Sequence, residues 1–495
     1  MPSLDAVFMA SPAGATVSYG NLFDRSAQFA NALADRGVRP GDRVAFQARK
    51  SVEAIIFYLA VERCGGVYLP LNTAYTSSEV DYFLRDAEPA MLVADGAEID
   101  RLKPVADSAG VAHTVALDAV GDASIGADAD QASTDFDDAR RGADDLAALL
   151  YTSGTTGRSK GAMLSHGNLV SNALALVEGW RFTADDVLIH ALPIFHTHGL
   201  FVATNVTLLA GSQMIVLPKF DVDAIIAAIP GATCLMGVPT FYTRLVASDR
   251  LSPDLCASMR LFISGSAPLQ ASTHAEFERA TGHAILERYG MTETNMITSN
   301  PYDDERRAGT VGFPLPGIRI RLADAETGEH RSVGEVGVVE VAGPNVFSGY
   351  WRMPEKTRAD FRGDGFFITG DLGQVDRDGY LTIVGRGKDL IISGGLNIYP
   401  KEVESAIDAL PGVLESAVVG VLHDDLGEGV VAAVVPRRGA TLEPGTMREA
   451  LSERLARFKQ PKEIVVVDEL PRNTMGKVQK NLLRETYAGL FAGRR

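Results

Sequence analysis

The sequence predicts an α/β protein with two domains: a large N-terminal domain of mainly parallel, βα-layered sheets and a small α+β C-terminal domain. Three observations predict this. The chain has 495 residues, which is more than a single hydrophobic core usually holds. Short apolar runs alternate with amphipathic segments over residues 1–386, as in parallel βα units. Residues 387–495 instead show a compact order of helix, strand, strand, helix and strand.

The N-terminal domain is expected to carry an amphipathic helix over Asn21–Asp35, which Gly37 ends. A helix over residues 52–62 follows, and Thr76 and Glu79 open a third one as a capping box. The apolar residues of the first helix are predicted to share one face, namely Leu22, Phe23, Phe29, Ala30 and Leu33. Strands are predicted at residues 42–48, 66–71, 146–150, 187–193, 214–218, 234–239 and 260–265. Functional groups are expected at the tips of these strands.

The stretch Asp118–Asp145 is rich in Ala, Asp and Gly and is predicted to be an exposed connection. The domain boundary is expected near Arg386–Lys388, because Gly385 and Gly387 leave the backbone unusually free there. A hinge and a plain turn both fit this pattern. The small domain is predicted to contain helices Lys401–Ala409 and Thr446–Arg457 and strands at residues 416–422, 430–436 and 463–470.

Composition excludes several functions. A content of 46% hydrophobic and 22% charged residues argues against disorder, and a net charge of −16 argues against a nucleic-acid partner. An anionic substrate must therefore be met by local cations. Three distant cysteines (Cys64, Cys234 and Cys256) suit reduced, buried thiols and show no metal-binding spacing. Since no leader and no apolar run of membrane length is visible, a cytoplasmic protein with no membrane partner is expected.

The segment YTSGTTGRSKG at residues 151–161 follows the apolar run at 146–150. Small residues after a strand let backbone N–H groups approach an anion, and Lys160 adds a positive charge, so the segment is typical of phosphate binding. The spacing between Gly154 and Gly157 is not that of the common P-loop. On its own, a Gly/Ser/Thr segment with a lysine is more often a flexible turn.

Four further segments carry candidate chemistry. RYGMTET contains Thr292 and Glu293, which suit Mg²⁺ held together with phosphate oxygens, or a surface glutamate at a helix start. ITGD is predicted to end a strand at Asp371, an acceptor for two ribose hydroxyls, and GRGKD offers Arg386 near the same sugar. PRNTMGKVQK presents Lys477. Together these segments predict a nucleotide bound between two domains.

In this order, the motifs resemble those of the acyl-adenylate-forming superfamily, which includes acyl-CoA synthetases, peptide-synthetase adenylation domains and firefly luciferase. The resemblance covers nearly the whole chain through YTSGTTGRSKG, FHTHG, SGSAPL, YGMTET, TGD, GRGKDLIISGGLNIYP and PRNTMGK. Ser159 departs from the proline usual in the family and should loosen the loop slightly. Within the family, HALPIFHTHGLFVATN, MGVPTFYTRL and RYGMTETNMITSNPYDDERRAGTVG are similar to segments of malonyl-CoA synthetases.

The resemblance implies ATP and coenzyme A as co-substrates and Mg²⁺ as the metal. It implies adenylation of a carboxylate followed by thioester formation, with Lys388 as the hinge between two domain arrangements and Gly394 and Gly395 lining a coenzyme A channel. The implied ATP-binding residues are Thr152, Ser153, Gly154, Thr155, Thr156, Gly157, Lys160, Ser266, Ala267, Pro268, Tyr289, Gly290, Met291, Asp371 and Arg386. The implied catalytic residues are Lys477, Glu293, Thr292 and His196, and the implied metal ligands are Glu293 and Thr155.

The substrate is predicted from charge. A short diacid needs a cation for its remote carboxylate, and Arg244 in PTFYTRL is the predicted bidentate partner, assisted by His196, Ser264 and Ser266. Arg244 facing solvent on a helix is the alternative. Among short diacids, the resemblance to malonyl-CoA synthetases implies malonate, or methylmalonate, as the substrate. The protein is expected to use it together with ATP and coenzyme A and to be a monomer or homodimer. A ligase for another short or aromatic acid, a carrier-protein loader and a nucleotide-binding sensor are the other hypotheses.

Overall fold

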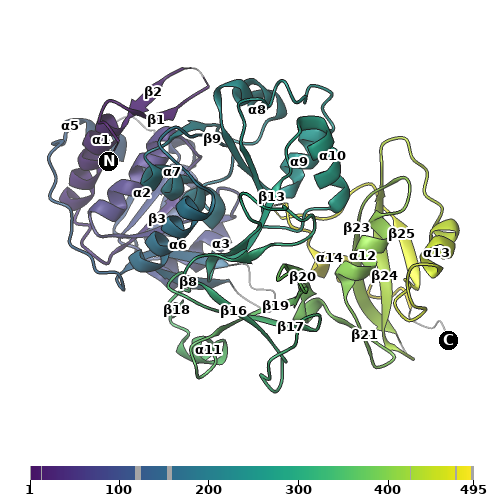
Figure 1. Cartoon of the computed structure of the whole chain (residues 1–495). Helices are drawn as coiled ribbons and strands as arrows, with labels where there is room; N and C mark the ends of the chain where they lie inside the picture. The colour runs from purple at the N-terminus through teal and green to yellow at the C-terminus, as the bar shows by residue number, and fades with distance from the viewer. Residues whose placement is uncertain are drawn as a thin grey trace.

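The computed structural model describes residues 2–12, 14–117, 124–152, 159–423, 425–473 and 476–491. Figure 1 shows a large domain, coloured purple to green, and a small yellow-green domain that lies beside it and contains the C-terminal helices and strands. This arrangement confirms the predicted α/β fold with two domains. None of the helices in the described part of the chain is long and apolar enough to cross a membrane.

The first sheet of the large domain places β9, β10, β11, β12 and β13 in parallel, with β1 parallel to β10. Its strand order among the described residues is β15-β14-β13-β12-β11-β9-β10-β1-β2. The strands are β1 (Val7–Ala10), β2 (Thr16–Ser18), β9 (Val187–His190), β10 (Gln213–Val216), β11 (Cys234–Gly237), β12 (Leu261–Ser264), β13 (Leu286–Met291), β14 (Asn295–Ser299) and β15 (Phe313–Pro314).

The second sheet of the large domain has the order β18-β8-β7-β4-β3-β5-β6. Strands β7, β4, β3, β5 and β6 run parallel, whereas β8 returns antiparallel to β7. The strands are β3 (Arg43–Gln47), β4 (Val67–Pro70), β5 (Met91–Ala94), β6 (His113–Ala116), β7 (Leu146–Thr152), β8 (Lys160–Ser165) and β18 (Gly349–Tyr350). The parallel strands of both sheets therefore provide the carboxyl ends that the sequence predicts.

A third sheet, which the sequence did not predict, is entirely antiparallel. It consists of β16 (Arg319–Ala323), β17 (Val336–Ala342), β19 (Phe367–Val375) and β20 (Leu381–Arg386). The prediction that a strand ends at Asp371 is wrong, because β19 continues to Val375 and pairs Asp371 with Arg386 across the hairpin. Gly370 and Gly373 resemble turn residues in the sequence, but here they lie within a strand.

The helices of the large domain cover the sheets and begin as the capping signals predict. Thr76 and Glu79 form the predicted capping box, and Gly37 follows the first helix with a φ of 87°. Phe23, however, is 51% exposed, because it lies about 100° around the helix from Leu22. The helices are α1 (Tyr19–Asp35), α2 (Val52–Arg63), α3 (Ser77–Ala87), α4 (Ile99–Ser108), α6 (His166–Gly179), α7 (Asn205–Ala210), α8 (Val222–Ala228), α9 (Pro239–Val246), α10 (Ala271–Thr281) and α11 (Pro354–Ala359).

The prediction of an exposed connection over Asp118–Asp145 is wrong for part of that stretch. Residues 118–123 lie outside the described residues, but helix α5 (Ile125–Gln131) follows them and packs against α1. Ile125 and Ala129 are fully buried in the main core. Their i, i+4 spacing places both on one face of the short helix, a signal that the high Asp and Ala content hides.

The small domain has two hydrophobic cores on either side of its own sheet. The sheet order is β22-β21-β24-β23, and β25 pairs with β24. Its elements are β21 (Ile391–Ser393), β22 (Leu396–Ile398), α12 (Pro400–Asp408), β23 (Val413–His423), β24 (Gly427–Pro436), α13 (Pro444–Ser452), β25 (Glu463–Val466) and α14 (Lys480–Tyr487). A 3₁₀ turn at Gly387–Asp389 connects β20 to this domain, while the boundary at 386/387 itself stays a prediction.

We predict that a buried ion pair stabilises the first sheet at the start of its strands. Arg260 lies 2.6 Å from Asp186, whose side chain is 4% exposed. The Arg260→Met variant leaves that carboxylate buried without its partner, so we expect a loss of about 3–5 kcal/mol, seen as a lower urea midpoint. Arg250→Met, which removes an exposed pair with Asp223, should lose less than about 1 kcal/mol. Equal shifts in the two variants would contradict this account.

Candidate active site

One group of side chains joins the end of β13 to the β19–β20 hairpin. Asp371 accepts a 2.5 Å hydrogen bond from the Tyr289 hydroxyl and pairs with the Arg386 Nε at 2.9 Å. Burial, together with the Asp371 charge, holds the pKa of Tyr289 well above its usual range, so the phenol remains a donor. Asp371 raises the pKa of Arg386 in turn. The arrangement fixes one carboxylate and one guanidinium beside an aromatic ring.

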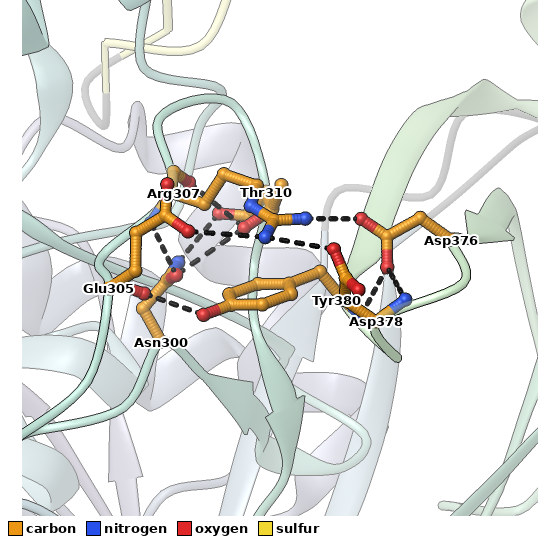
Figure 2. Close-up of polar contacts among 7 residues, drawn as sticks. All are labelled: Asn300, Glu305, Arg307, Thr310, Asp376, Asp378 and Tyr380. Carbon is orange, nitrogen blue, oxygen red and sulfur yellow. Dashed lines mark hydrogen bonds and ion pairs between the residues drawn. The ribbon is translucent and has the colours of Figure 1, made fainter.

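A second network holds the far turn of the same hairpin. Figure 2 shows Arg307 among three carboxylates, with its guanidinium over the Tyr380 ring. Arg307 pairs with Asp376 at 2.7 Å and with Glu305 and Asp378 at 3.1 Å each. Because Glu305 precedes Arg307 in the loop after β14, these contacts tie the hairpin to the segment that follows β13 and β14. The hairpin that carries Asp371 is therefore anchored at both ends.

A third group lies where the predicted phosphate loop begins and ends. Thr152 at the end of β7 pairs with Lys160 at the start of β8, and the Lys160 Nζ lies 4.8 Å from the centre of the Tyr350 ring. The Tyr350 hydroxyl donates a 3.1 Å hydrogen bond to the Oε1 of Glu293. The predicted loop residues Ser153, Gly154, Thr155, Thr156 and Gly157 lie outside the described residues.

Glu293 is buried, unlike a surface glutamate at a helix start. It is 7% exposed and lies in the turn between β13 and β14, next to the half-buried Thr292. Burial raises the pKa of its carboxyl group, while Tyr350 and the charges of Arg386 and Lys160 oppose that shift. A nearby cation would favour the charged carboxylate further.

The residues fit a magnesium ion that is held mainly by substrate oxygens. Among the described residues, no group of three or more His, Cys, Asp or Glu side chains could hold a metal. Mg²⁺ often binds through one or two carboxylates together with phosphate oxygens and water. The Glu293 carboxylate, with one oxygen on Tyr350, keeps acceptor positions for such an ion.

Lys477 enters this region from the small domain. Burial lowers the pKa of its ammonium group to about 8; the positive charges of Arg386 and Arg288 lower it too, whereas Asp371 and Glu293 raise it. Its loop approaches α9, since a Cβ on Gly476 would lie 3.3 Å from the Thr240 Oγ1. The structure therefore brings the Lys477 ammonium group close enough to the charged residues of the large domain for them to shift its pKa.

A buried arginine that the sequence analysis missed lies at the centre of the site. Arg288 on β13 is 3% exposed, and no described carboxylate forms an ion pair with it. Burial lowers its pKa to about 9. Its guanidinium lies against Gly265, where a Cβ would be 2.4 Å from the Cζ, and its Nη2 donates to the Ser266 Oγ at 3.4 Å. The cation is held by packing rather than by a counter-ion.

Several polar atoms around Arg288 are buried and have no hydrogen-bond partner in the described part of the chain. They include the Nε of Arg288, the Oγ of Ser264 and the Nε2 of His198. Such atoms are uncommon in folded proteins, and where they gather they indicate a missing polar ligand. The Ser266 backbone has a φ of 70°, unusual for a serine, and its hydroxyl lies 3.4 Å from the Nδ1 of His198. A small anionic ligand would satisfy this set.

His196 lies at the edge of the same group. Burial lowers its pKa to about 3, helped by the charges of Lys477 and Arg288, so the ring is neutral. The backbone N–H of His198 donates to its Nδ1 at 3.4 Å. That contact assigns the proton to Nε2 and makes this atom a donor.

The other predicted residues lie at the rim or outside the group. Arg244 is exposed on α9, with its guanidinium 5.7 Å from the Phe220 ring centre. It shares a face of α9 with Thr240, which faces the Lys477 loop. Ala267 and Pro268 form the turn after β12, and Gly290 and Met291 end β13. Lys388 is exposed, and Gly394 and Gly395 form the exposed turn of the β21–β22 hairpin, outside this group.

Arg288, His198 and Tyr350 were assigned no role in the sequence analysis. A signal for Arg288 exists: this arginine stands in the strand LERYGM, directly after the buried Leu286 and Glu287. Charged side chains are rarely buried without a partner, so an arginine in a buried strand indicates a ligand or an ion pair. Tyr350 gave no such signal, because it approaches Glu293 only through the pairing of β18 with β8.

Comparisons with known families agree with this geometry. Residues 2–351 match the family model described as AMP-binding enzyme, and residues 402–477 match the AMP-binding enzyme C-terminal domain. The chain belongs to the AMP-binding enzyme family. The resemblance to acyl-adenylate-forming enzymes is thereby confirmed.

Two curated relatives and one pair of solved structures are similar over nearly their whole length. A malonate–CoA ligase from Arabidopsis thaliana is 35% identical, covering 91% of this chain and 79% of the relative. An indoleacetate–CoA ligase from Aromatoleum aromaticum is 36% identical, covering 95% and 93%. ATP-bound MatB from Rhodopseudomonas palustris is 59% identical, with a TM-score of 0.96 and coverage of 99% and 97%. Apo MatB from the same organism gives the same identity and coverage but a TM-score of 0.86. The structure described here is thus more similar to the ATP-bound structure than to the apo structure.

We predict that Lys477 is an unusually reactive amine at mild pH. Because its pKa is about 8, a large fraction is uncharged at pH 8, and competitive acetylation followed by mass spectrometry should give half-maximal reactivity near that value. Arg386→Gln removes a neighbouring positive charge and should raise the midpoint, whereas Asp371→Asn should lower it. The exposed Lys103 serves as an internal standard. A Lys477 midpoint above pH 10 that neither variant moves would contradict the described environment.

Proposed function

We propose that the chain is a malonate–CoA ligase, which joins malonate to coenzyme A through a malonyl-adenylate and releases AMP and pyrophosphate. The single observation that carries the proposal is Arg288, a buried cation that has no counter-ion among the described residues and lies beside the Ser264 hydroxyl, which has no described partner either. Leaving a buried charge unpaired is unfavourable, so the site favours a ligand with a second carboxylate. The similarity to a curated malonate–CoA ligase supports the same substrate. Methylmalonate keeps both carboxylates and is the second proposed substrate.

A ligase for an aromatic acid is the competing candidate, supported by the similarity to an indoleacetate–CoA ligase. An indole ring could stack on the Arg288 guanidinium. It would nevertheless leave this guanidinium desolvated and without a carboxylate partner. Malonate satisfies the guanidinium with a charge-assisted hydrogen bond, which is the stronger interaction. We therefore favour the diacid.

In the proposed first half-reaction, a malonate oxygen attacks the α-phosphorus of ATP and pyrophosphate leaves. Both reactants are anions, so the protein must supply positive charge at fixed positions. Lys477 would neutralise charge on the carboxylate and α-phosphate oxygens, and the neutral His196 would donate from Nε2 to the reacting carboxylate. Arg288 would hold the remote carboxylate, and Arg244 would stand at the entrance.

The proposed nucleotide contacts follow the three groups of the site. Asp371 and Arg386 would bind the ribose, and Thr292 the α-phosphate. The adenine would lie against Tyr289, and Lys160 would meet the β- and γ-phosphates. The remaining proposed contacts are Thr152, Ser153, Gly154, Thr155, Thr156 and Gly157 with phosphate, and Ser266, Ala267, Pro268, Gly290 and Met291 with adenine. When bound through Glu293 and Thr155, Mg²⁺ would supply charge neutralisation on the phosphates.

In the proposed second half-reaction, the small domain turns about Lys388 and withdraws Lys477. The thiol of coenzyme A then attacks the acyl carbon, the thiol proton passes to solvent, and AMP leaves with the bonding electron pair. Gly394 and Gly395, exposed here on the β21–β22 turn, would line the channel for the thiol arm in that arrangement. Domain rotation lets one cleft serve two reactions.

The proposed setting is the cytoplasm. The three cysteines are buried and unpaired, which suits a reducing compartment. The proposed partners are the small molecules malonate, ATP and coenzyme A.

The experiment that tests the proposal is a CoA-dependent AMP-release assay with six acids: malonate, methylmalonate, succinate, acetate, butyrate and indoleacetate. We expect the highest kcat/KM with malonate or methylmalonate. A clear preference for indoleacetate or a monocarboxylate would replace the proposed substrate. AMP release that does not depend on coenzyme A would contradict the proposed formation of a thioester.

We predict that the two arginines differ in what they recognise. Arg288→Met keeps an unbranched apolar stem but removes the guanidinium charge, so kcat/KM for malonate should fall by about 30–150-fold, equivalent to about 2–3 kcal/mol. The rate with butyrate, which lacks the remote carboxylate, should hold or rise. Arg244→Met is the matched control and should have the smaller effect. If only Arg244→Met shows the malonate-specific loss, the remote carboxylate binds at the exposed arginine.

We predict that Lys477→Ala separates the two half-reactions. Adenylation, followed as malonate-dependent ATP–pyrophosphate exchange, should slow by about 10²–10³-fold, the usual effect of losing one charge-stabilising donor. The reaction of pre-formed malonyl-adenylate with coenzyme A should proceed nearly as in the unmodified chain. Equal losses in both assays would rule out a role confined to adenylation.

A further inference from the structure

We propose that Lys50 is a positioning residue for the adenylation step, because its ammonium group holds the backbone that leads into His196. The inference rests on the proposed function. Lys50 lies outside every motif that the sequence analysis identified. It follows β3 in the second sheet and directly precedes Ser51, which caps α2 by accepting a 3.1 Å hydrogen bond from the Ala54 N–H.

The Lys50 side chain crosses from the second sheet to the first. Its Nζ donates to the His190 carbonyl oxygen at 2.7 Å and to the Leu192 carbonyl oxygen at 3.0 Å. It also lies 2.9 Å from the Nδ1 of His190. An ammonium group has three N–H donors, and these three acceptors match them. His190 ends β9, so Lys50 ties the carboxyl end of this strand to the end of β3.

Lys50 is half-buried and forms no ion pair with a described carboxylate, and desolvation of its ammonium group holds its pKa well below the usual range. An apolar side chain of similar length would fill the space without desolvating a charge. The contribution that an apolar side chain cannot supply is hydrogen bonding to two backbone carbonyl groups, those of His190 and Leu192. Lys50 thus acts on the path of the chain rather than on core volume.

That path leads to His196 through a segment with little freedom. A Cβ on Gly199 would lie 2.1 Å from the Pro193 carbonyl oxygen, so the backbone after Leu192 is packed tightly against residue 199. The His196 carbonyl oxygen accepts hydrogen bonds from the N–H groups of Gly199 and Leu200 at 3.1 and 2.9 Å. A shift of Leu192 would therefore be transmitted to the His196 ring.

Lys50→Met tests the proposal in the full chain. The variant keeps the volume and removes the donors, so ATP–pyrophosphate exchange should fall by about 10–100-fold, the scale of a misplaced catalytic group. The loss should appear in kcat and equally with malonate and butyrate, since His196 faces the carboxylate that both acids share. The KM for ATP and the reaction of malonyl-adenylate with coenzyme A should stay unchanged. Lys103→Met, which removes an exposed lysine, is the matched control.

Chemical rescue separates positioning from packing. In Lys50→Ala, ethylammonium or propylammonium should restore exchange in a saturable manner, whereas tetramethylammonium, which has the charge but no N–H donor, should not. Normal exchange in Lys50→Met would overturn the proposal. So would parallel losses in ATP affinity, thioester formation and thermal stability with no amine rescue. A failure of malonate as substrate would show in the unmodified chain, so the two proposals fail separately.

Discussion

The site depends on positive charges that form no ion pair with a carboxylate among the described residues. Arg288, Lys477 and Lys50 all have lowered pKa values, and burial is the largest cause in each case. The chain as a whole carries a net charge of −16, so its overall field would repel an anion. In the proposed function, Arg288 and Lys477 therefore supply local positive charge to the anionic substrates, whereas Lys50 positions the backbone. The surroundings position each of the three cations. Arg288 packs against Gly265, Lys50 donates to two carbonyl groups, and Lys477 is brought in by the small domain.

The fold supplies that geometry through the carboxyl ends of parallel strands. Strand β9 leads into the loop that carries His196, whereas Ser264 lies in β12 and Arg288 in β13. Strand β7 leads into the predicted phosphate loop. The antiparallel hairpin β19–β20 adds Asp371 and Arg386 and leads directly to the small domain. Arg386 precedes that connection and Lys477 follows it in the small domain. The relative position of the two domains therefore decides whether Lys477 lies near Arg386. In the proposed function, substrate binding and domain arrangement would thus be coupled in one site.

The sequence predicted the parts of the fold that local signals determine. The capping box at Thr76, the strand at residues 146–150 and the change of pattern after residue 386 all depend on neighbouring residues. Predictions failed where distant pairing decides: β19 continues through Asp371 because β17 and β20 flank it, and α5 is buried because α1 covers it. Arg288 could have been noticed as an arginine in a buried strand, but the sequence does not show that no described carboxylate pairs with it.

The central claim is that Arg288 binds the remote carboxylate of the substrate. A crystal structure with malonyl-adenylate bound tests this claim most directly. The account predicts that the remote carboxylate lies within about 2.7–2.9 Å of the Arg288 guanidinium, the range of charge-assisted hydrogen bonds, with the Ser264 hydroxyl as a further donor. A remote carboxylate that lies on another cation, with Arg288 still lacking an anionic partner, would contradict it.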